Sequence, residues 1–465
     1  MAWRWRLFAV ALLAALTVPR MTQRGMFLDG MTYAVVARNM AVGVGTLWAP
    51  SVSATTYQQF YEQPPLGMAI ESAAFRLLGD RFFVERVCAL MAFGLSAFLI
   101  CAIWRQFWPA QYDWMPLLFW ILPSVVTWGV VNNMLENIQT VFTCLAVLAM
   151  LSATRSSSAA AAAAWSITGG IATVAAALVK GPVGLFPLAV PPLLWLIRPS
   201  GRRLRLGACW VVGWTVTALA LGGLLLYEPS RRSIGLFLQT HLAPAMRGDR
   251  GSGWQMFDLS RHLILGIWAR MGILAALIWI ATRRHARPVS DWRAIGFFLA
   301  LGLAASVPIL ASPVMAGHYF IPSIPFFALA AGGLIPSRFG ADAARGSSIW
   351  RVRVPTVAAA VLIVATVAVP LLYGSIEPRN RVLISGLDGI AAAVPRGHTI
   401  GSCTSARTNF GLQTYLQRFF RVSVAPDGTP VNGWFLIADS SCEVPPDCHP
   451  AATGPTLALY RCERR

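Results

Sequence analysis

The sequence predicts an all-α membrane protein that crosses the bilayer many times and ends in a small α/β domain. Of its 465 residues, 56% are hydrophobic and only 12% are charged, whereas soluble proteins carry about 25% charged residues. Apolar runs close to twenty residues long recur along most of the chain, and a helix of that length spans a bilayer. From residue 374 onward the runs give way to short alternating segments that hold four of the eight cysteines.

The spanning helices are predicted on the apolar runs, of which there are about eleven. They cover residues 6–20, 82–104, 114–130, 134–152, 160–179, 183–197, 207–227, 260–281, 294–311, 318–335 and 355–373. No convincing small-residue cleavage site follows the first run, so we interpret it as an uncleaved span rather than a signal peptide. Residues 1–373 are thus predicted to form a membrane domain and 374–465 a soluble one.

The arginines between the runs predict the orientation. With a cytoplasmic N-terminus, the cytoplasmic loops are 105–113, 153–159, 198–206, 282–293 and 336–354, which hold fourteen arginines against three aspartates. This excess follows the positive-inside rule and places the C-terminal domain outside the cytoplasmic membrane. The net charge of +19 is therefore a topology signal, and without any nucleic-acid-binding motif we predict no nucleic-acid partner.

Two long segments, 21–81 and 228–259, are also predicted to lie outside. The first contains two amphipathic helices, at 31–42 and 64–78, which we expect to lie along the membrane interface. Their apolar faces are Tyr33, Val36, Ala37 and Met40 in one helix and Leu66, Ile70, Ala73 and Leu77 in the other. The second segment is polar and rich in glycine.

The C-terminal domain is predicted as a small α/β sandwich. Its strands are expected at 398–403, 421–425, 433–438 and 456–461, with a helix at 406–420. Its four cysteines, Cys403, Cys442, Cys448 and Cys462, lie where disulfides form, so we expect bridges among them. The sequence leaves the three possible pairings open, and four reduced thiols without a role are the alternative.

Acidic residues are rare, so their positions are informative. Asp29 follows the first span, Glu62 precedes Pro64 and Pro65 in the same loop, and Glu136 stands near the outer end of the fourth span. A charge near hydrocarbon is costly and is usually retained for function or pairing. The structural alternatives are that Asp29 caps the 31–42 helix and that Glu136 bonds between helices.

Lys180 is the only lysine. Either codon bias has removed the others, or a compact ammonium is needed at this position. His241 lies in the second outer loop, where a solvated surface role is the alternative to a functional one, and His318 and Tyr319 open the tenth span, where aromatic residues often mark the interface. No catalytic triad, nucleotide-binding glycine loop or zinc-binding cysteine cluster is present, so an enzyme with a soluble nucleotide donor is not supported.

These positions, taken in order, resemble the membrane glycosyltransferases of the GT-C fold, namely the protein O-mannosyltransferases and aminoarabinose transferases of families 39 and 83. The similar segments are 27–33 (Phe-Leu-Asp-Gly-Met-Thr-Tyr), 37–40, 61–66 (Tyr-Glu-Gln-Pro-Pro-Leu), 77–79, 85–86, 178–182 (Leu-Val-Lys-Gly-Pro), His241 and 318–325. The resemblance covers roughly residues 1–335. No single motif is decisive, but their order and their predicted side of the membrane agree with the family.

The resemblance implies transfer of a sugar from a polyprenyl-phosphate donor, usually undecaprenyl-linked in bacteria, on the outer face of the inner membrane. The acceptor would be a glycolipid, a glycan or a protein, and the chain would contact membrane lipid throughout. Asp29 would be the general base of an inverting reaction, and Glu136 an acid that binds the acceptor or serves structure. The predicted donor and phosphate ligands are Lys180, Arg38, Tyr33, Gln63 and Tyr319, with the 231–250 arginines available, and Glu62 and His241 would hold a divalent metal ion.

The sequence also departs from the family pattern. The acidic pair is reduced to Asp29 and Gly30, the lysine before the two prolines is Gln63, and the residue before His241 is Thr240. These changes argue against protein mannosylation and against aminoarabinose transfer in particular. The alternatives from other classes are a transporter of lipid-linked sugars and a non-catalytic scaffold, but no inverted repeat supports the first.

Overall fold

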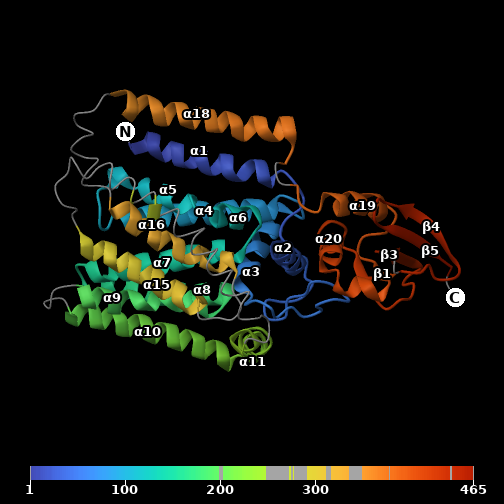
Figure 1. Cartoon of the computed structure of the whole chain (residues 1–465). Coiled ribbons are helices and arrows are strands. Elements are labelled where there is room, and N and C mark those ends of the chain that lie inside the picture. Colours follow the sequence, from blue (N-terminus) through green and yellow to red (C-terminus); the bar gives the residue numbers. More distant parts are fainter. Residues whose placement is uncertain are drawn as a thin grey trace. The chain divides into compact units, whose positions relative to one another are not determined.

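The computed structural model describes residues 2–197, 203–247, 272–273, 276, 291–310, 316–334, 348–375, 378–439 and 442–463. The chain divides into two compact units, each built from several stretches of sequence. Unit 1 is Met1–Pro19, Glu62–Gly67 and Ala89–Tyr373, and unit 2 is Arg20–Tyr61, Met68–Cys88 and Gly374–Arg465. Figure 1 labels most of the α-helices and strands of both units.

All regular secondary structure in the described residues of unit 1 is helical. Its elements are all but the last two residues of α1 (Ala2–Met21), the Ala89–Trp104 part of α4 (Val84–Trp104), η1 (Ala110–Tyr112), α5 (Met115–Ile121), α6 (Ser124–Val131), α7 (Leu135–Arg155), α8 (Ala159–Lys180), η2 (Pro182–Ala189), α9 (Val190–Ile197), α10 (Arg203–Leu226), α11 (Glu228–Phe237), η4 (Leu238–Leu242), α12 (Ala243–Arg247), α15 (Trp292–Leu310), η7 (Gly317–Ser323), α16 (Ile324–Gly333) and α18 (Ser348–Tyr373). Helix α8 packs against α7 and α10, and α16 packs against α15 and α5. Several of these helices run side by side in Figure 1.

The membrane character predicted from the sequence is confirmed. Within the described residues, six helices are long and apolar enough to cross a membrane, or seven if the bent pair Ala110–Ile121 and Ser124–Val131 forms one span. The six are α4, α7, α8, the Leu206–Leu226 part of α10, α15 and the Arg353–Tyr373 part of α18. The run 260–281 falls almost wholly outside the described residues, so the number of about eleven spans stays a prediction.

Prolines break three of the predicted straight spans. The run 114–130 bends by 79° where Pro123 adopts an extended conformation between α5 and α6, because proline lacks an N–H donor and cannot continue the helix ladder. The runs 183–197 and 318–335 begin as the tighter 3-10 helices η2 and η7, which contain Pro187 and Pro322 respectively. Irregular backbone in a membrane protein is tolerated where protein buries it, and η7 is largely buried.

Unit 2 joins most of the first outer segment to the C-terminal residues. Its elements are α2 (Leu28–Ala41), the Met68–Leu78 part of α3 (Leu66–Leu78), α19 (Arg381–Ala391), η8 (Thr404–Thr408), α20 (Phe410–Phe420), β1 (Thr399–Ser402), β2 (Ser423–Ala425), β3 (Trp434–Ile437), β4 (Cys448–Thr453) and β5 (Ala458–Cys462). The strands form one sheet of order β2-β1-β3-β5-β4. Strand β1 is parallel to β2 and β3, and β5 is antiparallel to β3 and β4.

One hydrophobic core explains why these distant stretches fold together. Met26 and Met31, from the beginning of the first outer segment, are buried in the same cluster as Leu412 and Tyr415 of α20. The Tyr415 hydroxyl also accepts from the Met26 backbone N–H at 3.1 Å. The predicted soluble domain at 374–465 is therefore completed by residues 20–61 and 68–88.

The two helices predicted to lie along the membrane interface are placed differently. Ten of the fourteen residues of α2 are buried, and the helix packs against α20 rather than presenting one apolar face to lipid. In α3 the predicted apolar face is the more exposed one, as a face turned toward lipid would be: Leu77 is 85% exposed, while Met68, Ser72 and Phe75 on the opposite side are buried. The interfacial position of α3 stays a prediction. For α2 the prediction failed because the sheet domain supplies a protein surface that covers the helix, and sequence periodicity cannot distinguish that surface from a bilayer.

The expected disulfides are confirmed, and the structure selects one of the three pairings. Cys403 bonds Cys442, and Cys448 bonds Cys462. The predicted strands are found within a few residues, but β4 and α19 were not predicted from the sequence. Strand β4 contains Pro450 and pairs only with β5 at the edge of the sheet, a position that tolerates proline.

Candidate active site

A buried acid, a lysine and a histidine meet in unit 1. Glu136 lies in the first turn of α7, Lys180 is the last residue of α8, and His318 belongs to η7. The Lys180 Nζ lies 3.1 Å from Glu136 Oε1, and His318 Nε2 lies 3.7 Å from the same oxygen. Because α8 ends at Gly181 with φ 88°, a conformation that favours glycine, the lysine is held at a fixed point beside the acid.

Aromatic rings surround this cluster. The Lys180 ammonium lies 5.6 Å from the centre of the Tyr319 ring, within range of a cation–π interaction. The His318 ring stacks on Trp128 with centroids 5.7 Å apart and meets Tyr319 edge to face. An ammonium in this setting is little screened by water, so its charge acts strongly on neighbouring groups.

Glu136 is poorly satisfied despite its two neighbours. Its side chain is 1% exposed, yet neither carboxylate oxygen accepts a hydrogen bond of normal geometry from the described residues. The contact with Lys180 is an ion pair by distance without that geometry. Such under-satisfied buried groups are uncommon and call for an explanation, which at functional sites is often an absent ligand.

A second pair of predicted residues also lies together in unit 1. His241 Nε2 is 3.6 Å from Glu62 Oε1, although the two are far apart in the sequence. His241 sits in the π-helical turn η4, a feature often found at functional sites, and its ring stacks on Phe237. The interpretation of His241 as a solvated surface residue is not supported, because its side chain is only 20% exposed.

Thr240 orients the His241 ring. The Thr240 hydroxyl donates to the Leu236 carbonyl at 2.7 Å, so at 2.8 Å it can accept from His241 Nδ1–H. The neutral ring would then direct the Nε2 lone pair toward the Glu62 carboxylate, a suitable arrangement for two ligands of one cation. Among the described residues, however, no group of three or more His, Cys, Asp or Glu side chains could hold a metal ion, and catalytic metal sites usually have three protein ligands.

Asp29 and Tyr33 lie on α2 in unit 2. Helix α2 begins at Leu28 with Phe27 as its N-cap residue, and no side chain caps it. The alternative role of Asp29 as the helix cap is therefore wrong, because the helix starts earlier than the 31–42 pattern indicated. Asp29 instead stands in the first turn, where the helix dipole favours an ionised carboxylate. Tyr33 is buried.

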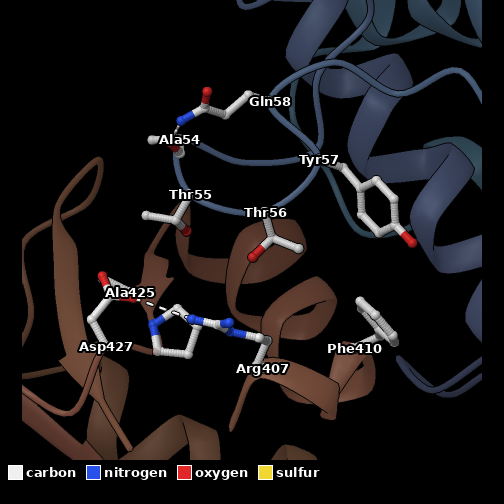
Figure 2. A pocket seen from close by; sticks show the side chains of 10 residues that line it. Ala54, Thr55, Thr56, Tyr57, Gln58, Arg407, Phe410, Ala425 and Asp427 are labelled. Atoms are coloured by element: carbon white, nitrogen blue, oxygen red, sulfur yellow. Dashed lines mark hydrogen bonds and ion pairs between the residues drawn. The ribbon is translucent and has the colours of Figure 1, made fainter. Parts of the chain in front are cut away.

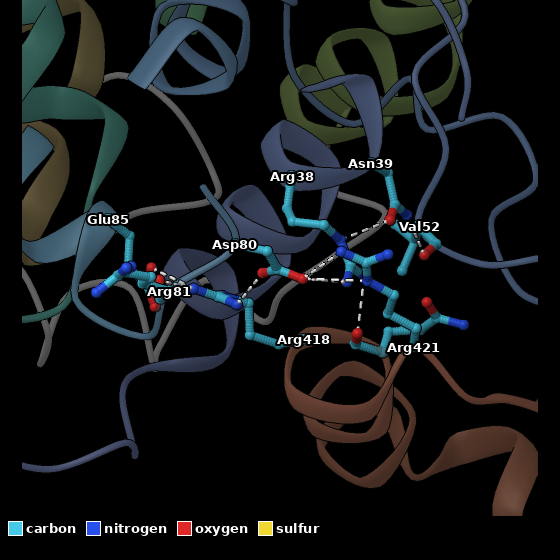
Figure 3. A network of polar contacts seen from close by, with 9 residues as sticks. Arg38, Asn39, Val52, Asp80, Arg81, Glu85, Arg418 and Arg421 are labelled. Atoms are coloured by element: carbon cyan, nitrogen blue, oxygen red, sulfur yellow. Dashed lines mark hydrogen bonds and ion pairs between the residues drawn. The ribbon is translucent and has the colours of Figure 1, made fainter. Parts of the chain in front are cut away.

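The contacts of Arg38 disfavour its predicted role as a phosphate ligand. Its side chain is 1% exposed and donates to the Asn39 side chain at 3.0 Å, the Gln417 carbonyl at 2.7 Å and Asp80 at 3.4 Å (Figure 3). Burial lowers the pKa of Arg38 to about 10, with Asp80 opposing the shift, so the guanidinium remains a cation at neutral pH. Its hydrogen bonds therefore join residues inside unit 2 rather than facing a ligand.

Arg38 belongs to an ion network that sequence reasoning missed. Asp80 accepts from Arg418 Nη1 at 2.9 Å and from Arg421 Nη2 at 2.8 Å, and Arg418 Nη2 donates to Glu85 at 2.7 Å (Figure 3). Burial raises the pKa of Asp80, but the hydrogen bond from Arg421 and the charges of the three arginines outweigh burial and lower it. The sequence segments 37–40 and 85–86 contain Arg38 and Glu85, but Arg418 and Arg421 lie more than three hundred residues beyond Asp80 and Glu85.

Gln63 is half-buried in unit 1, next to Glu62. The arginines expected to assist at 231–250 are only partly described: Arg231 and Arg232 lie in α11 and Arg247 ends α12, whereas Arg250 lies outside the described residues. The structure thus brings Glu136, Lys180 and Tyr319 together, and separately Glu62 and His241. It assigns Arg38 to other contacts.

No protein-family model matches the chain, and no characterised protein sequence matches it. Two solved structures of ArnT from Cupriavidus metallidurans match it over 98% of this chain and 97% of theirs, at 16% sequence identity. The one bound to undecaprenyl phosphate gives a TM-score of 0.65, and the apo structure gives 0.62. The archaeal oligosaccharyltransferase AglB from Archaeoglobus fulgidus, in complex with an inhibitory peptide and a dolichol-phosphate, gives 0.48 at 13% identity over 90% of this chain, a likeness too weak to support an inference.

The likeness to ArnT extends over nearly the whole of both chains. It shows that this chain has the ArnT fold. The class predicted from the sequence, a GT-C membrane fold with a small C-terminal sheet domain, is therefore confirmed.

Proposed function

We propose that this chain is a glycosyltransferase that moves a sugar from a polyprenyl-phosphate donor to an acceptor at the outer face of a bacterial inner membrane. The observation that carries the proposal is the end-to-end likeness to ArnT, one structure of which is bound to undecaprenyl phosphate. Two further features agree with it. The only lysine of the chain has a side chain that is 9% exposed and lies beside the Tyr319 ring, and the loops that the arginine pattern predicts to be outside carry Asp29, Glu62 and His241.

The proposed reaction is a single displacement. The acceptor hydroxyl attacks the anomeric carbon of the donor sugar, and the bond from that carbon to the phosphate oxygen breaks with inversion. The electron pair leaves with the polyprenyl phosphate, and the hydroxyl proton passes to the Asp29 carboxylate. A base must be ionised and within reach of its proton, and a place in the first turn of α2 favours the ionised form.

Lys180 is proposed to stabilise the departing phosphate. Fixed positive charge is most effective where negative charge develops in a site sheltered from water, and the Lys180 side chain is only 9% exposed. An ammonium carries three donors, so it can hold Glu136 and a phosphate oxygen together. The Tyr319 ring lies 5.6 Å from the same ammonium, which supports its proposed role as a donor-binding residue. Tyr33 and Gln63 remain donor-binding proposals that rest on the family resemblance alone.

Glu62 and His241 fit as two ligands of a divalent cation, as the family resemblance implies. When bound, such an ion would supply additional positive charge near the phosphate. The described residues provide only this pair of ligands. The protein itself orients the histidine of the pair, because Thr240 fixes the His241 ring and both Thr240 and His241 belong to η4.

The test is sugar transfer by the full-length protein in lipid nanodiscs, with undecaprenyl-phosphate sugars as donors and with acceptors identified by mass spectrometry of envelope material from a deletion strain. Asp29→Asn should reduce transfer by at least about 10²-fold, within or above the usual contribution of general acid–base catalysis. It should leave folding and lipid binding intact, because the amide keeps the shape of the side chain. Thr32→Val, one turn into the same helix, is the matched control.

Full transfer by Asp29→Asn would show that the base is misassigned. Movement of lipid-linked sugars across the bilayer without transfer would instead identify a transporter and overturn the proposed reaction.

A further inference from the structure

Unit 2 contains a cavity of about 520 Å³, with a lining of mixed polar and apolar character, that the proposed reaction does not use. It lies between the loop 54–58 and the C-terminal residues 407, 410 and 425–427, all within unit 2. Its volume falls in the range of about 300–1,000 Å³ typical of small-molecule sites. Figure 2 shows the rings of Tyr57 and Phe410 at one side and Asp427 at the other, with Thr56 and Arg407 between them.

The backbone at Tyr57 is strained. Tyr57 has a φ of 47°, a left-handed conformation that is a genuine outlier for a bulky residue. Strain of this kind persists only when the surroundings impose it, and it is concentrated at functional sites.

The loop around Tyr57 imposes the strain through several hydrogen bonds. The Val52 N–H donates to the Tyr57 carbonyl at 3.0 Å, and the Asn39 side chain donates to the Ser51 and Val52 carbonyls at 3.0 and 2.8 Å. The Thr55 hydroxyl donates to the Val424 carbonyl at 2.6 Å. The loop is thus fixed at both ends to α2 and to β2, so the Tyr57 ring is presented in one direction.

The strained residue presents an aromatic surface to a cavity that polar side chains also line. The rings of Tyr57 and Phe410 lie 5.8 Å apart at a tilt of 38°, and they stay 38% and 39% exposed. Exposed rings next to hydroxyl, amide and charged groups suit a ligand with one apolar face and a polar rim. A pyranose ring has this chemistry: its C–H face packs on aromatic rings, and its hydroxyls bond planar polar side chains.

The charges of the cavity favour a neutral saccharide. Arg407 and Asp427 lie 3.6 Å apart and are 70% and 65% exposed, so together they add no net charge. They offer donors and acceptors for neighbouring hydroxyls, as do Thr56 and Gln58. We infer that this cavity binds a neutral saccharide portion of the acceptor. The inference rests on the proposed function only in assigning that saccharide to the acceptor.

The test is saccharide binding by the full-length protein in nanodiscs without donor, measured by saturation-transfer NMR with cellotriose and chitotriose as probes. Phe410→Ala and Tyr57→Asn should each weaken binding of the better probe by about threefold to tenfold, the usual contribution of an aromatic contact. Asparagine tolerates positive φ, so Tyr57→Asn keeps the loop conformation while removing the ring. Phe82→Ala, an exposed ring of the same unit that does not line the cavity, is the matched control and should bind normally.

Equal binding by wild type, Phe410→Ala and Tyr57→Asn, or no binding of either probe, would overturn the inference. Asp29→Asn distinguishes the two proposals, because it should bind the saccharide normally while losing transfer. Intact transfer with no saccharide binding removes only the inference, whereas saccharide binding without any transfer removes only the proposed reaction.

Discussion

Asp80 in unit 2 and Glu136 in unit 1 both lie beside basic side chains, but they differ in the hydrogen bonds that their carboxylates accept. Asp80 accepts hydrogen bonds from three arginines. Glu136 lies 3.1 Å from one lysine, and neither of its oxygens receives a well-directed hydrogen bond from the described residues. The planar arginine fork can satisfy both oxygens of a carboxylate, whereas the ammonium of a lysine is a point charge without that geometry.

This difference distinguishes a carboxylate that stabilises the fold from one that can take part in binding a ligand. A carboxylate with hydrogen bonds to both oxygens is held in place and has little capacity left for a ligand. The Asp80 carboxylate is of this kind, and the hydrogen bond that it accepts from Arg418 joins it to α20 within unit 2. An incompletely bonded cluster in an apolar setting retains that capacity. We therefore expect changes at the Asp80 network to act on stability and changes at the Glu136 cluster to act on transfer.

The largest expected effect is on the stability of unit 2. Arg418→Ala removes the cation that bonds both Asp80 and Glu85 and leaves Glu85, which is 1% exposed, as a buried charge without Arg418. Breaking a buried pair in this way costs about 3–5 kcal/mol. The loss of unfolding free energy is measured by denaturant unfolding, monitored with a probe of unit 2 such as protease cleavage in α20.

Arg407→Ala is the matched control for Arg418→Ala. Its exposed pair with Asp427 should contribute less than about 0.5 kcal/mol. Similar losses in the two variants would show that the network does not stabilise unit 2 and would remove the contrast with Glu136.

The second prediction uses a double variant at the Glu136 cluster. Lys180→Gln should lower transfer by about 10²–10³-fold, the usual cost of losing one stabilising group at a developing charge. It should also destabilise unit 1, because Glu136 is then buried without its cation. Adding Glu136→Gln should restore stability without restoring transfer, since both groups are then neutral amides.

Recovery of transfer in the Glu136→Gln/Lys180→Gln double variant would contradict this interpretation. It would show that Lys180 only balances Glu136 and that the pair is a structural contact between α7 and α8. Thermal unfolding and transfer rates measured on the same nanodisc samples separate the two outcomes.

The sequence predicted the local part of this fold well. Apolar run lengths located the helices, because burial in lipid requires about twenty apolar residues whatever the partner. Cysteine crowding in the C-terminal domain also predicted the bridges. The sequence did not predict contacts between distant segments. We predicted α2 at the membrane interface because its apolar pattern was visible, whereas the helix that buries it, α20, lies far along the chain.

The candidate site was predicted in part for the same reason. Rare residue types drew attention to Lys180, Glu136, Glu62 and His241, and the structure brings them together as two pairs. Arginines are common in this chain, so neither composition nor spacing could show that the Arg38 guanidinium would donate its hydrogen bonds to Asp80 and Gln417. The cavity at Tyr57 was invisible, because backbone strain at a tyrosine has no sequence signature.

The smallest expected effect is a pH dependence carried by Asp80. Its pKa is lowered in the folded protein from the ordinary value of 3.8, so its contribution to stability is fully present above that value. The contribution is lost as the pH falls below 3.8 and through the lower folded value, because folded and unfolded states then bind the same proton. Asp80→Asn should cost about 1.5–3 kcal/mol at pH 7, the contribution of hydrogen bonds to a charged group. The difference in unfolding free energy between wild type and Asp80→Asn should shrink as the pH is lowered below about 4. A difference that stays constant down to pH 2 would mean that the arginines do not hold Asp80 ionised, and the contrast with Glu136 would then rest on hydrogen-bond geometry alone.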